Sequence, residues 1–462
     1  MTRKIVTVAI VIMMAVSGLY ACAVGDDVNP ALDTSKEITL TVAGGAEDPV
    51  GMEAIAESFT KKYPNCHIVY EYMQDYGNTL PKRLASADSG IDLFITSNIQ
   101  ADSPNLPYAL ELFSHADVLD LSQTFSGLID NFTFVATDAN AAKQIYAIPL
   151  GAELRGMYVN KTLLASLGLQ VPTDREEFMN CCQVLLEHGY VPIQGNPSTV
   201  GQQLFYPYIC NLVANASDYD TVHAAVESRQ ASAAEYFREP LQLLYDIVKD
   251  GYYNYKHVET DLGLFVDGKV VTSTYDFLNI VKGADGSYKA GSDVGQVAFM
   301  PSIMSLNSNL ARAKEDYHSA IDYEFILSPL GPDGGYAYMS PADGIAINKN
   351  SAHTDWALEF LDFMFKPANN KVFAKEQGLT PNVKDAFSQI KERFSIADDR
   401  ISQLGSVTFS YNFFSICKKT LTDISKANNP KYMMTAADGS VSMYGFDYYM
   451  EIFTARLTGA SD

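Results

Sequence analysis

Tryptophan, histidine and basic side chains are scarce in this chain of 462 residues. It has one tryptophan, seven histidines, and 33 Lys and Arg against 55 Asp and Glu, so its net charge is -22. A surface this acidic repels phosphate backbones, which excludes nucleic acid as a partner. It favours an extracytoplasmic protein that avoids non-specific association. The hydrophobic share of 47% and the length predict two or three compact units with large cores.

Cysteines are few and irregularly spaced. An odd number outside the N-terminal segment does not form a disulfide framework, so we expect buried free thiols. Because no metal-ligand or cofactor motif is present, we predict neither a metal nor a cofactor. The cysteines that remain apart from Cys22 are Cys66, Cys181, Cys182, Cys210 and Cys417.

Motifs of catalysis are also missing. The chain contains no G-x-S-x-G, H-E-x-x-H, P-loop or C-x-x-C pattern. Ser58 and Ser415 each lie three residues before a lysine, but the partner motifs S-D-N and K-T-G are absent. Glu47 with Asp48, or Glu153 with another carboxylate, could serve a glycosidase if suitably separated. We predict a protein that is not an enzyme and keep a surface glycoside hydrolase as an alternative.

One long apolar run lies near the N-terminus, at residues 5–20, behind a positively charged start. It is shorter than the roughly 20 apolar residues of a bilayer span, which predicts a signal peptide over 1–21. The alternative is an anchor helix. The sequence "LYAC" that ends at Cys22 resembles a bacterial lipobox, which predicts lipidation of Cys22 and a solvated tether over 22–36. Several acyl chains would hold such a protein firmly to the membrane.

Strands and helices alternate after the tether. We predict strands at 37–45, 66–72 and 91–96 with helices between them, a pattern typical of parallel pairing with right-handed crossovers. Ligands of such open sheets lie beyond the carboxyl ends of the strands. This rule alone places residues 44–48 and 97–100 at a candidate site.

A second α/β set follows, beginning with a strand at 156–160. Thr173 and Glu176 have the spacing of a capping box at a helix start. The stretch "FVDGKVVTSTYDF" at 265–277 predicts a helix end, a turn, a strand and a new helix start. Residues 283–322 are rich in glycine, serine and asparagine, which favours loops, short helices and an insertion. Strands resume within 323–351, and the C-terminal part is mostly helical.

Four stretches in the same order resemble the extracellular solute-binding proteins of the sugar-binding family 1 type, the receptor components of ABC importers. They cover most of residues 37–390, while the last 60 or so residues match less well. The stretches are "LTVAGGAEDPVGMEAIAESFTKKYPNCHIVYEY", "YAIPLGAELRGMYVNKTLL", "FVDGKVVTSTYDF" and "DGIAINKNSAHTDWALEFLDFMFKPANNKVFAKEQGLTPN".

The resemblance implies an α/β fold of the two-lobed periplasmic-binding-protein type (type II). Each lobe would be a mixed sheet flanked by helices, and hinge strands would join the lobes around a cleft. Solute in the cleft would stabilise a closed form. The expected boundaries are 37–149 and 323–347 for lobe one, and 150–322 and 348–462 for lobe two with the C-terminal helices.

The resemblance and the strand ends together select the candidate ligand-binding residues. Carboxylates and amides would hold sugar hydroxyls, and flat aromatic rings would stack on sugar C–H faces. An interlobe salt bridge for Glu153 and Arg155, and core packing for Phe277, stay open as alternatives. Tyr76, Tyr206 and Tyr208 are secondary candidates. The main candidates are Glu47, Asp48, Asn98, Glu153, Arg155, Tyr275, Asp276, Phe277, Asp343 and Gly344.

The sequence therefore predicts a monomeric, lipid-anchored, extracytoplasmic receptor that delivers a sugar or oligosaccharide to separately encoded ABC permease subunits. The single tryptophan weakens the case for a large oligosaccharide, since sugar sites frequently use that residue. Other interpretations are a receptor for another polar solute, an orphan lipoprotein that signals to a sensor, and an adhesin without a hinged cleft.

Overall fold

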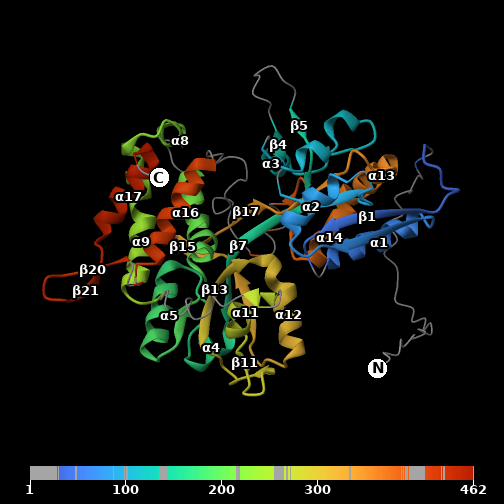
Figure 1. Cartoon of the computed structure of the whole chain (residues 1–462). Helices are drawn as coiled ribbons and strands as arrows, with labels where there is room; N and C mark the ends of the chain where they lie inside the picture. The colour runs from blue at the N-terminus through green and yellow to red at the C-terminus, as the bar shows by residue number, and fades with distance from the viewer. Residues whose placement is uncertain are drawn as a thin grey trace.

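Two separate β-sheets organise the molecule, as the computed structural model shows (Figure 1). Each sheet carries its own helices and its own core, so the predicted two-lobed α/β architecture is confirmed. The structure describes residues 29, 31–46, 49–86, 88–97, 99, 102–134, 143–214, 219–253, 265–266, 269–270, 272–331, 334–386, 388, 390, 394, 411–427, 429 and 432–460.

The first sheet has the strand order β2-β1-β3-β18-β6. Strand β1 pairs in parallel with β2 and β3, as predicted, whereas β18 runs antiparallel to β3 and β6. Strand β18 comes from far along the chain and so returns the polypeptide to this lobe. The strands are β1 (Ile38–Gly44), β2 (Cys66–Tyr72), β3 (Leu93–Thr96), β6 (Ile148–Pro149) and β18 (Gly344–Ile347).

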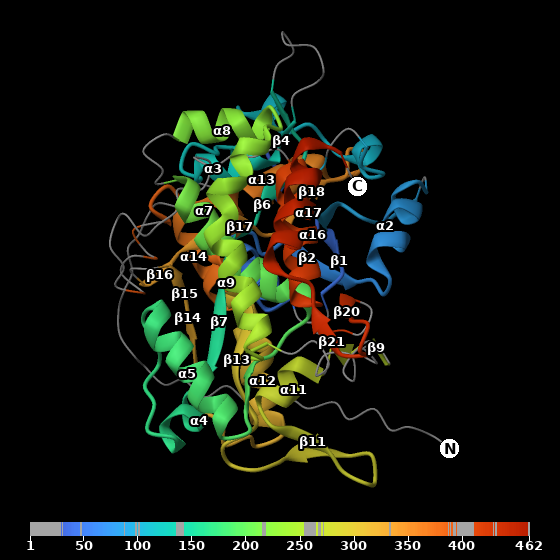
Figure 2. The ribbon, with the colours of Figure 1, turned by 90° about the vertical axis from the view of Figure 1, so that its left-hand side faces the viewer.

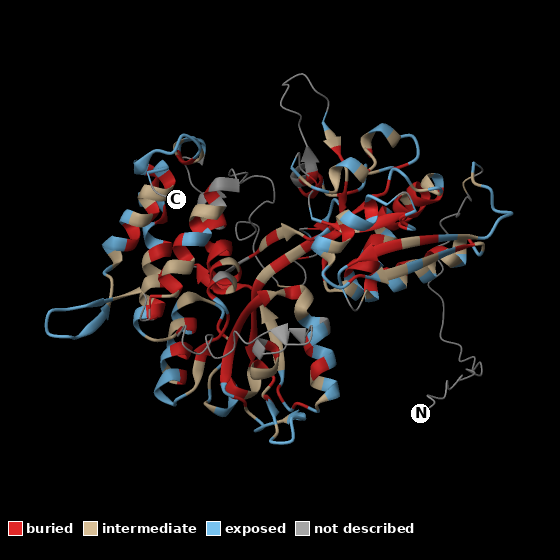
Figure 3. Ribbon diagram, in the orientation of Figure 1, coloured by how far each residue is buried: buried red, intermediate tan, exposed pale blue. Residues whose placement is uncertain are grey.

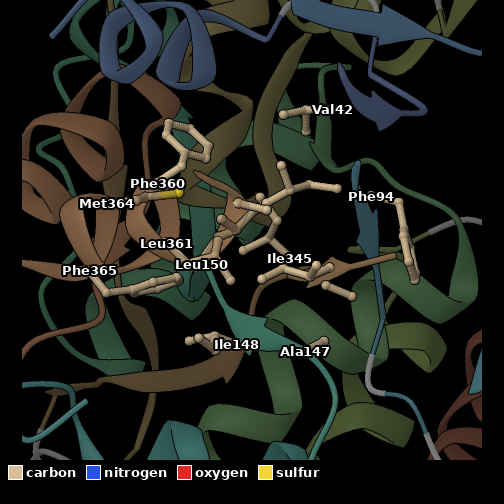
Figure 4. Packing of buried hydrophobic residues seen from close by; sticks show 14 of the residues in the cluster. Val42, Phe94, Ala147, Ile148, Leu150, Ile345, Phe360, Leu361, Met364 and Phe365 are labelled. Atoms are coloured by element: carbon tan, nitrogen blue, oxygen red, sulfur yellow. The ribbon is translucent and has the colours of Figure 1, made fainter. Parts of the chain in front are cut away.

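Helices cover this sheet with apolar faces of helical spacing. Helix α1 (Val50–Lys62) buries Met52, Ile55 and Phe59. In Figure 4, Phe360 and Met364 of α13 belong to the same cluster of buried side chains as Ile345 of β18. Burial of this kind contributes about 1.5–3 kcal/mol for each large apolar side chain. The remaining helices and 3-10 turns here are α2 (Tyr76–Leu84), η1 (Leu106–Tyr108), η2 (Phe113–His115), α3 (Ser126–Phe132), α13 (Thr354–Phe365) and α14 (Pro367–Gln377).

The second sheet is built around β7 (Gly151–Asn160), the longest strand. Its order is β14-β7-β13-β8, and β17 and β19 pair with the first part of β7. Figure 3 shows β7 as a buried stripe that runs from the junction of the lobes into the second lobe. The other strands are β8 (Val191–Ile193), β13 (Val297–Ile303), β14 (Tyr323–Ile326), β17 (Tyr338–Pro341) and β19 (Thr380–Pro381).

Helices α9, α16 and α17 lie side by side on the second lobe, as both ribbon views show (Figures 1 and 2). Phe413 of α16 and Phe453 of α17 pack in the main core against Phe237, the last residue of η4. The helical segments are α4 (Lys161–Ser166), α5 (Arg175–Glu187), α6 (Pro197–Thr199), the π-helix η3 (Val200–Phe205), α7 (Tyr206–Ala214), α8 (Tyr219–Glu227), η4 (Ala231–Phe237), α9 (Arg238–Lys249), α11 (Thr272–Phe277), η5 (Met304–Leu306), α12 (Asn307–Asp316), α16 (Tyr411–Ser425) and α17 (Phe446–Thr458).

Among the described residues, five two-stranded sheets lie outside the two main sheets. One of them, β20-β21, projects from the second lobe near the C-terminus (Figure 1). Their strands are β4 (Thr133–Phe134) with β5 (Gln144–Ile145), β9 (Phe265–Val266) with β10 (Lys269–Val270), β11 (Ile280–Lys282) with β12 (Tyr288–Ala290), β15 (Ser328–Gly331) with β16 (Gly334–Tyr336), and β20 (Met433–Thr435) with β21 (Val441–Met443).

Three chain crossings join the lobes, at β6 to β7, at β17 to β18, and at α14 to β19. Backbone hydrogen bonds tie the first two together, from Leu150 N–H to Asp343 O at 3.0 Å and from Ala342 N–H to Gly151 O at 2.9 Å. Two fully buried asparagines brace them: Asn370 donates to Leu150 O at 3.2 Å, and Asn382 donates to Pro149 O at 2.8 Å. The crossings therefore form one hydrogen-bonded bundle.

Some segments lie elsewhere than the sequence predicted. The 323–347 segment was assigned to lobe one, but β14 and β17 join the second sheet and only β18 joins the first. Helices α13 and α14, assigned with 348–462 to lobe two, pack on the first sheet because their apolar faces meet α1 and β18. At α5 the cap is Asp174, which accepts from Glu177 N–H at 2.9 Å, one residue beyond the predicted capping box.

The five described cysteines are free and buried, in agreement with the sequence. Burial raises the pKa of the thiols, to about 12 for Cys66 and about 11 for Cys181. Thiols with raised pKa are poor nucleophiles, so these residues act as small core side chains. Cys22 lies outside the described residues. Within the part of the chain that the structure describes, no helix is long and apolar enough to cross a bilayer.

Candidate functional site

A cavity of about 600 Å³ opens at the junction of the two lobes. It lies beyond the carboxyl ends of β1 and β3, where the topology rule placed a site. The second lobe contributes Glu153 of β7 and Ser305 of η5, so both lobes share the wall. The lining residues are Gly45, Ala46, Pro49, Met52, Tyr70, Tyr76, Gly77, Leu80, Ile95, Thr96, Ser97, Asn105, Leu150, Glu153, Ser305, Ala342, Asp343, Phe373, Gln377 and Leu379.

Two tyrosines form the aromatic wall on the first lobe. The hydroxyl of Tyr76 lies 3.0 Å from Ala43 O and 2.5 Å from Ile95 O, so it bridges β1 and β3. The hydroxyl of Tyr70 accepts from Ala46 N–H at 3.1 Å. Burial raises the pKa of both phenols. Because each hydroxyl is tied to the backbone, the rings are held in place beside the cavity.

Gly44 makes room for one of these rings. A Cβ at Gly44 would overlap the hydroxyl of Tyr70. Since Tyr70 lies on β2, directly beside β1 in the sheet, a side chain at Gly44 would push its hydroxyl away from Ala46 N–H. Gly44, the last residue of β1, therefore permits the close approach of an aromatic ring, one of the recurrent roles of glycine.

Glu153 is the acidic side chain that the second lobe presents to the cavity. The Oγ of Ser305 lies 3.4 Å from its Oε1. Burial raises the pKa of Glu153; the charge of Arg155 opposes this shift, and the charge of Asp343 adds to it. A half-buried carboxylate with one long hydrogen bond is under-satisfied and can accept hydrogen bonds from a ligand.

Asp343 is the second carboxylate of the wall, and it precedes β18 at a chain crossing. Its side chain is open to the cavity, and the surrounding protein raises its pKa by desolvation. Gly344 follows it in β18, where a Cβ would collide with the ring of Phe132 and crowd Ile148 O. Gly344 is therefore needed for strand packing, and it is not among the residues that line the cavity.

Arg155 lies two residues after Glu153 on the same face of β7, but it is not part of the cavity wall. Its guanidinium donates to Ser340 Oγ at 2.9 and 3.1 Å and to Gln203 Oε1 at 3.1 Å. It also lies 5.9 Å from the ring centre of Tyr338. These neutral partners hold the cation behind Glu153. Gln203 belongs to the π-helix η3, a type of segment often found at functional sites.

The predicted group Tyr275, Asp276 and Phe277 lies in α11, away from the cavity wall. Phe277 is a core residue with no exposed surface. Tyr275 packs against two tyrosines of the second lobe and shares a hydrogen bond of 3.1 Å with the hydroxyl of Tyr317. Asp276 accepts from Gln194 Nε2 at 2.9 Å. The predicted strand is only two residues long here, so α11 takes these side chains into the lobe.

The other predicted residues divide into three groups. Glu47, Asp48 and Asn98 lie outside the described residues. Tyr76, a secondary candidate, lines the cavity. Tyr206 and Tyr208 are buried in the core of the second lobe.

Sequence reasoning missed several wall residues. Tyr70 lies near the carboxyl end of β2, so the topology rule could have found it. Ser305, Phe373 and Gln377 reach the wall through tertiary packing, and no sequence motif marks them. In the described part of the chain, no three His, Cys, Asp or Glu side chains gather as metal ligands.

This two-lobed geometry has known counterparts. The family model described as bacterial extracellular solute-binding protein matches residues 43–371. The chain belongs to this family. No curated protein sequence matches this solute-binding protein significantly.

Solved structures of similar fold include maltose-bound MalE3 of T. maritima, with 14% identity, coverage of 92% of this chain and 100% of that one, and a TM-score of 0.56. The GacH receptor of Streptomyces glaucescens, solved unliganded and with acarbose, is 14% identical, with coverage of 92% of this chain and 100% of that one and a TM-score of 0.58. BlMnBP1 of Bifidobacterium animalis subsp. lactis is the binding protein of an ABC transporter, solved in complex with mannobiose. It is 17% identical, with coverage of 92% of this chain and 95% of that one and a TM-score of 0.56. The TM-scores and the coverage establish a shared fold.

Proposed function

We propose that this solute-binding protein is the lipid-anchored, extracytoplasmic receptor of an ABC importer and binds a carbohydrate between its lobes. The observation that carries the proposal is a cavity wall combining the rings of Tyr70 and Tyr76 with the carboxylates of Glu153 and Asp343. Sugars offer C–H faces to aromatic rings and hydroxyl donors to carboxylates. The sugars named for the three structures of similar fold support the same ligand class.

In this proposal the lobes close over the solute. We assign the described residues of 37–149 and 342–379 to lobe one, and those of 150–341 and 380–460 to lobe two. Closure is a population shift, driven by contacts that the solute makes better in the closed form. Glu153 and Asp343 sit next to two of the chain crossings, so a ligand held by both acts close to the bending axis. The closed monomer then delivers its solute to separately encoded permease subunits.

A screen of solutes tests the ligand class. Saccharides, polyols, amino acids and small peptides are added in a thermal-shift assay, and hits are titrated by calorimetry. At a hundredfold excess over the dissociation constant, binding adds about 2.7 kcal/mol to the free energy of unfolding. A true solute should also reduce the radius of gyration in solution scattering.

The alternatives predict other results in the same screen. A receptor for another polar solute responds to a non-carbohydrate hit alone. A surface glycoside hydrolase releases reducing ends from a bound oligosaccharide. An orphan sensor binds and closes over its ligand but supports no uptake in cells. An adhesin shows no compaction with any small solute.

Lipidation at Cys22 has its own test. The wild-type protein should fractionate with membranes of its bacterial host, and Cys22→Ala should be released or left unprocessed. Equal membrane association of both forms with the signal uncleaved would mean that the apolar run at 5–20 is itself the anchor. A matched Cys66→Ala variant controls for loss of a cysteine elsewhere.

A further inference from the structure

The charge of the cavity wall has one sign. Among the described lining residues, Glu153 and Asp343 are acidic, and none is Lys, Arg or His. The cation nearest in sequence, Arg155, is held behind Glu153 by Ser340 and Gln203. A solute in the cavity therefore meets two carboxylates and, among the described lining residues, no cation. Between low-dielectric walls such charges act more strongly than at an open surface.

Asp343 and Asp92, two carboxylates of the same lobe, differ in how many hydrogen bonds the protein donates to them. Among the described residues, no hydrogen-bond donor or cation contacts the carboxylate of Asp343. Asp92, by contrast, accepts from Thr41 N–H at 2.9 Å and from Ser351 Oγ at 2.5 Å. The Asp343 side chain is exposed, and desolvation by the surrounding wall raises its pKa. A carboxylate in this state gains most from a ligand that brings a positive charge.

We propose that this cavity selects solutes by charge: a saccharide that carries an ammonium group binds more tightly than its neutral parent, and one that carries a carboxylate is rejected. Asp343 is the residue that determines this specificity, with Glu153 as the second acceptor. The inference rests on the proposed function and names the substrate class within it. An amino sugar retains the C–H faces for Tyr70 and Tyr76 and adds charge-assisted hydrogen bonds, which are roughly twice as strong as neutral ones.

Matched saccharides test the inference directly. Calorimetric titrations compare cellobiose with the corresponding glucosamine disaccharide and with cellobiouronic acid, and maltose and mannobiose with their amino and uronic counterparts, at neutral pH. We expect the amino form to bind about tenfold more tightly than its neutral parent, and the acidic form at least about tenfold more weakly. The amino preference should shrink as salt is added, because ions screen the attraction.

Two variants locate the effect. Asp343→Asn should bring the affinities of the three forms closer together. Asp250→Asn removes the same charge from an exposed position at the end of α9, and we expect it to keep the wild-type ratios. Equal affinities for amino and neutral forms, tighter binding of an acidic form, or an unchanged ratio in Asp343→Asn would each overturn the inference.

The outcomes also separate this inference from the proposed function. If neutral saccharides bind but amino forms gain nothing, charge selection fails and carbohydrate binding stands. If no saccharide binds but spermidine raises the melting temperature in an Asp343-dependent way, carbohydrate binding fails and charge selection stands. If neither saccharides nor spermidine bind, both are overturned.

Discussion

Two glutamates of this protein lie in regions that use a buried carboxylate in opposite ways. The carboxylate oxygens of Glu359 in α13 are satisfied by hydrogen bonds and a lysine of its own lobe. Its Oε1 accepts from the hydroxyl of Tyr63 at 2.6 Å and lies 3.3 Å from Lys62 Nζ, and its Oε2 accepts from Asn29 Nδ2 at 3.0 Å. The side chains of Lys62 and Glu359 are only 5% and 8% exposed. Burial would raise the pKa of Glu359, but these hydrogen bonds and the lysine charge lower it overall.

Glu153 receives fewer hydrogen bonds from the protein than Glu359. Its hydrogen bond from Ser305 is long at 3.4 Å, and the net effect of burial, Arg155 and Asp343 is a raised pKa. In the proposed function, this difference assigns Glu359 to stability and Glu153 to ligand binding. A carboxylate whose acceptors are filled by the protein stabilises the fold, whereas one that is left unfilled at a cavity is available to a ligand.

Truncation of Glu359 should have the largest effect. Glu359→Ala leaves Lys62 buried without its partner, which costs about 3–5 kcal/mol in the free energy of unfolding. Urea denaturation measures this loss. The double variant Lys62→Met with Glu359→Leu, which replaces the pair by apolar groups, should recover most of it. A loss below about 1 kcal/mol for Glu359→Ala would mean that the pair is not a structural element.

A change in the aromatic wall should lower saccharide affinity more than it lowers the stability of the apo protein. Tyr70→Leu keeps an apolar side chain but removes the flat ring and the hydroxyl that accepts from Ala46 N–H. We expect about a tenfold loss of saccharide affinity. The apo protein should lose no more than about 1.5 kcal/mol. An unchanged affinity would remove Tyr70 from the site.

The pH dependence of stability should have opposite signs at the two glutamates. The lowered pKa of Glu359 means that its stabilisation is present above the ordinary pKa of 4.5 and is lost as the pH falls through the folded-state value. The raised pKa of Glu153 means that its contribution is present below 4.5 and is lost as the pH rises through its folded-state value.

Glu359→Gln should therefore reduce the loss of stability as the pH falls below 4.5. Glu153→Gln should reduce the loss of stability as the pH rises above 4.5. Melting temperatures measured from acid to neutral pH check both slopes. Identical profiles for the wild type and both variants would refute the assigned directions.

The smallest effect is expected outside both regions, at Tyr275. Tyr275→Phe removes a hydroxyl bonded to Tyr317 and leaves the ring in its cluster. Stability should fall by about 1 kcal/mol or less. Saccharide affinity in calorimetry should stay within about twofold, since the residue does not line the cavity. A tenfold loss of affinity would return Tyr275 to the candidate site.

Sequence patterns were sufficient where local spacing decides the structure. The apolar spacing of Met52, Ile55 and Phe59 predicted α1, and alternation of strands and helices predicted the parallel pairing of β1, β2 and β3. The resemblance to the solute-binding family selected Glu153 and Asp343, and both line the cavity, while their contact with a ligand stays a prediction. These features depend mainly on residues that are close together in the sequence.

The sequence was insufficient where tertiary packing decides. A short run before Tyr275 was interpreted as a strand leading to the cleft, but α11 begins there and directs Phe277 into the core. Helix α13 is apolar on several faces, so its pattern could not say which lobe it joins. Ser305 meets Glu153 only through the turn after β13.

The central claim is that Glu153 is reserved for the solute. Saccharide affinity and apo melting temperature measured together on Glu153→Gln test it most directly. We predict a tenfold to hundredfold loss of affinity, about 1.5–3 kcal/mol for a charged acceptor, with a melting temperature that is unchanged or higher at neutral pH. A lower melting temperature with unchanged affinity per folded molecule would contradict the claim and make Glu153 a structural residue like Glu359.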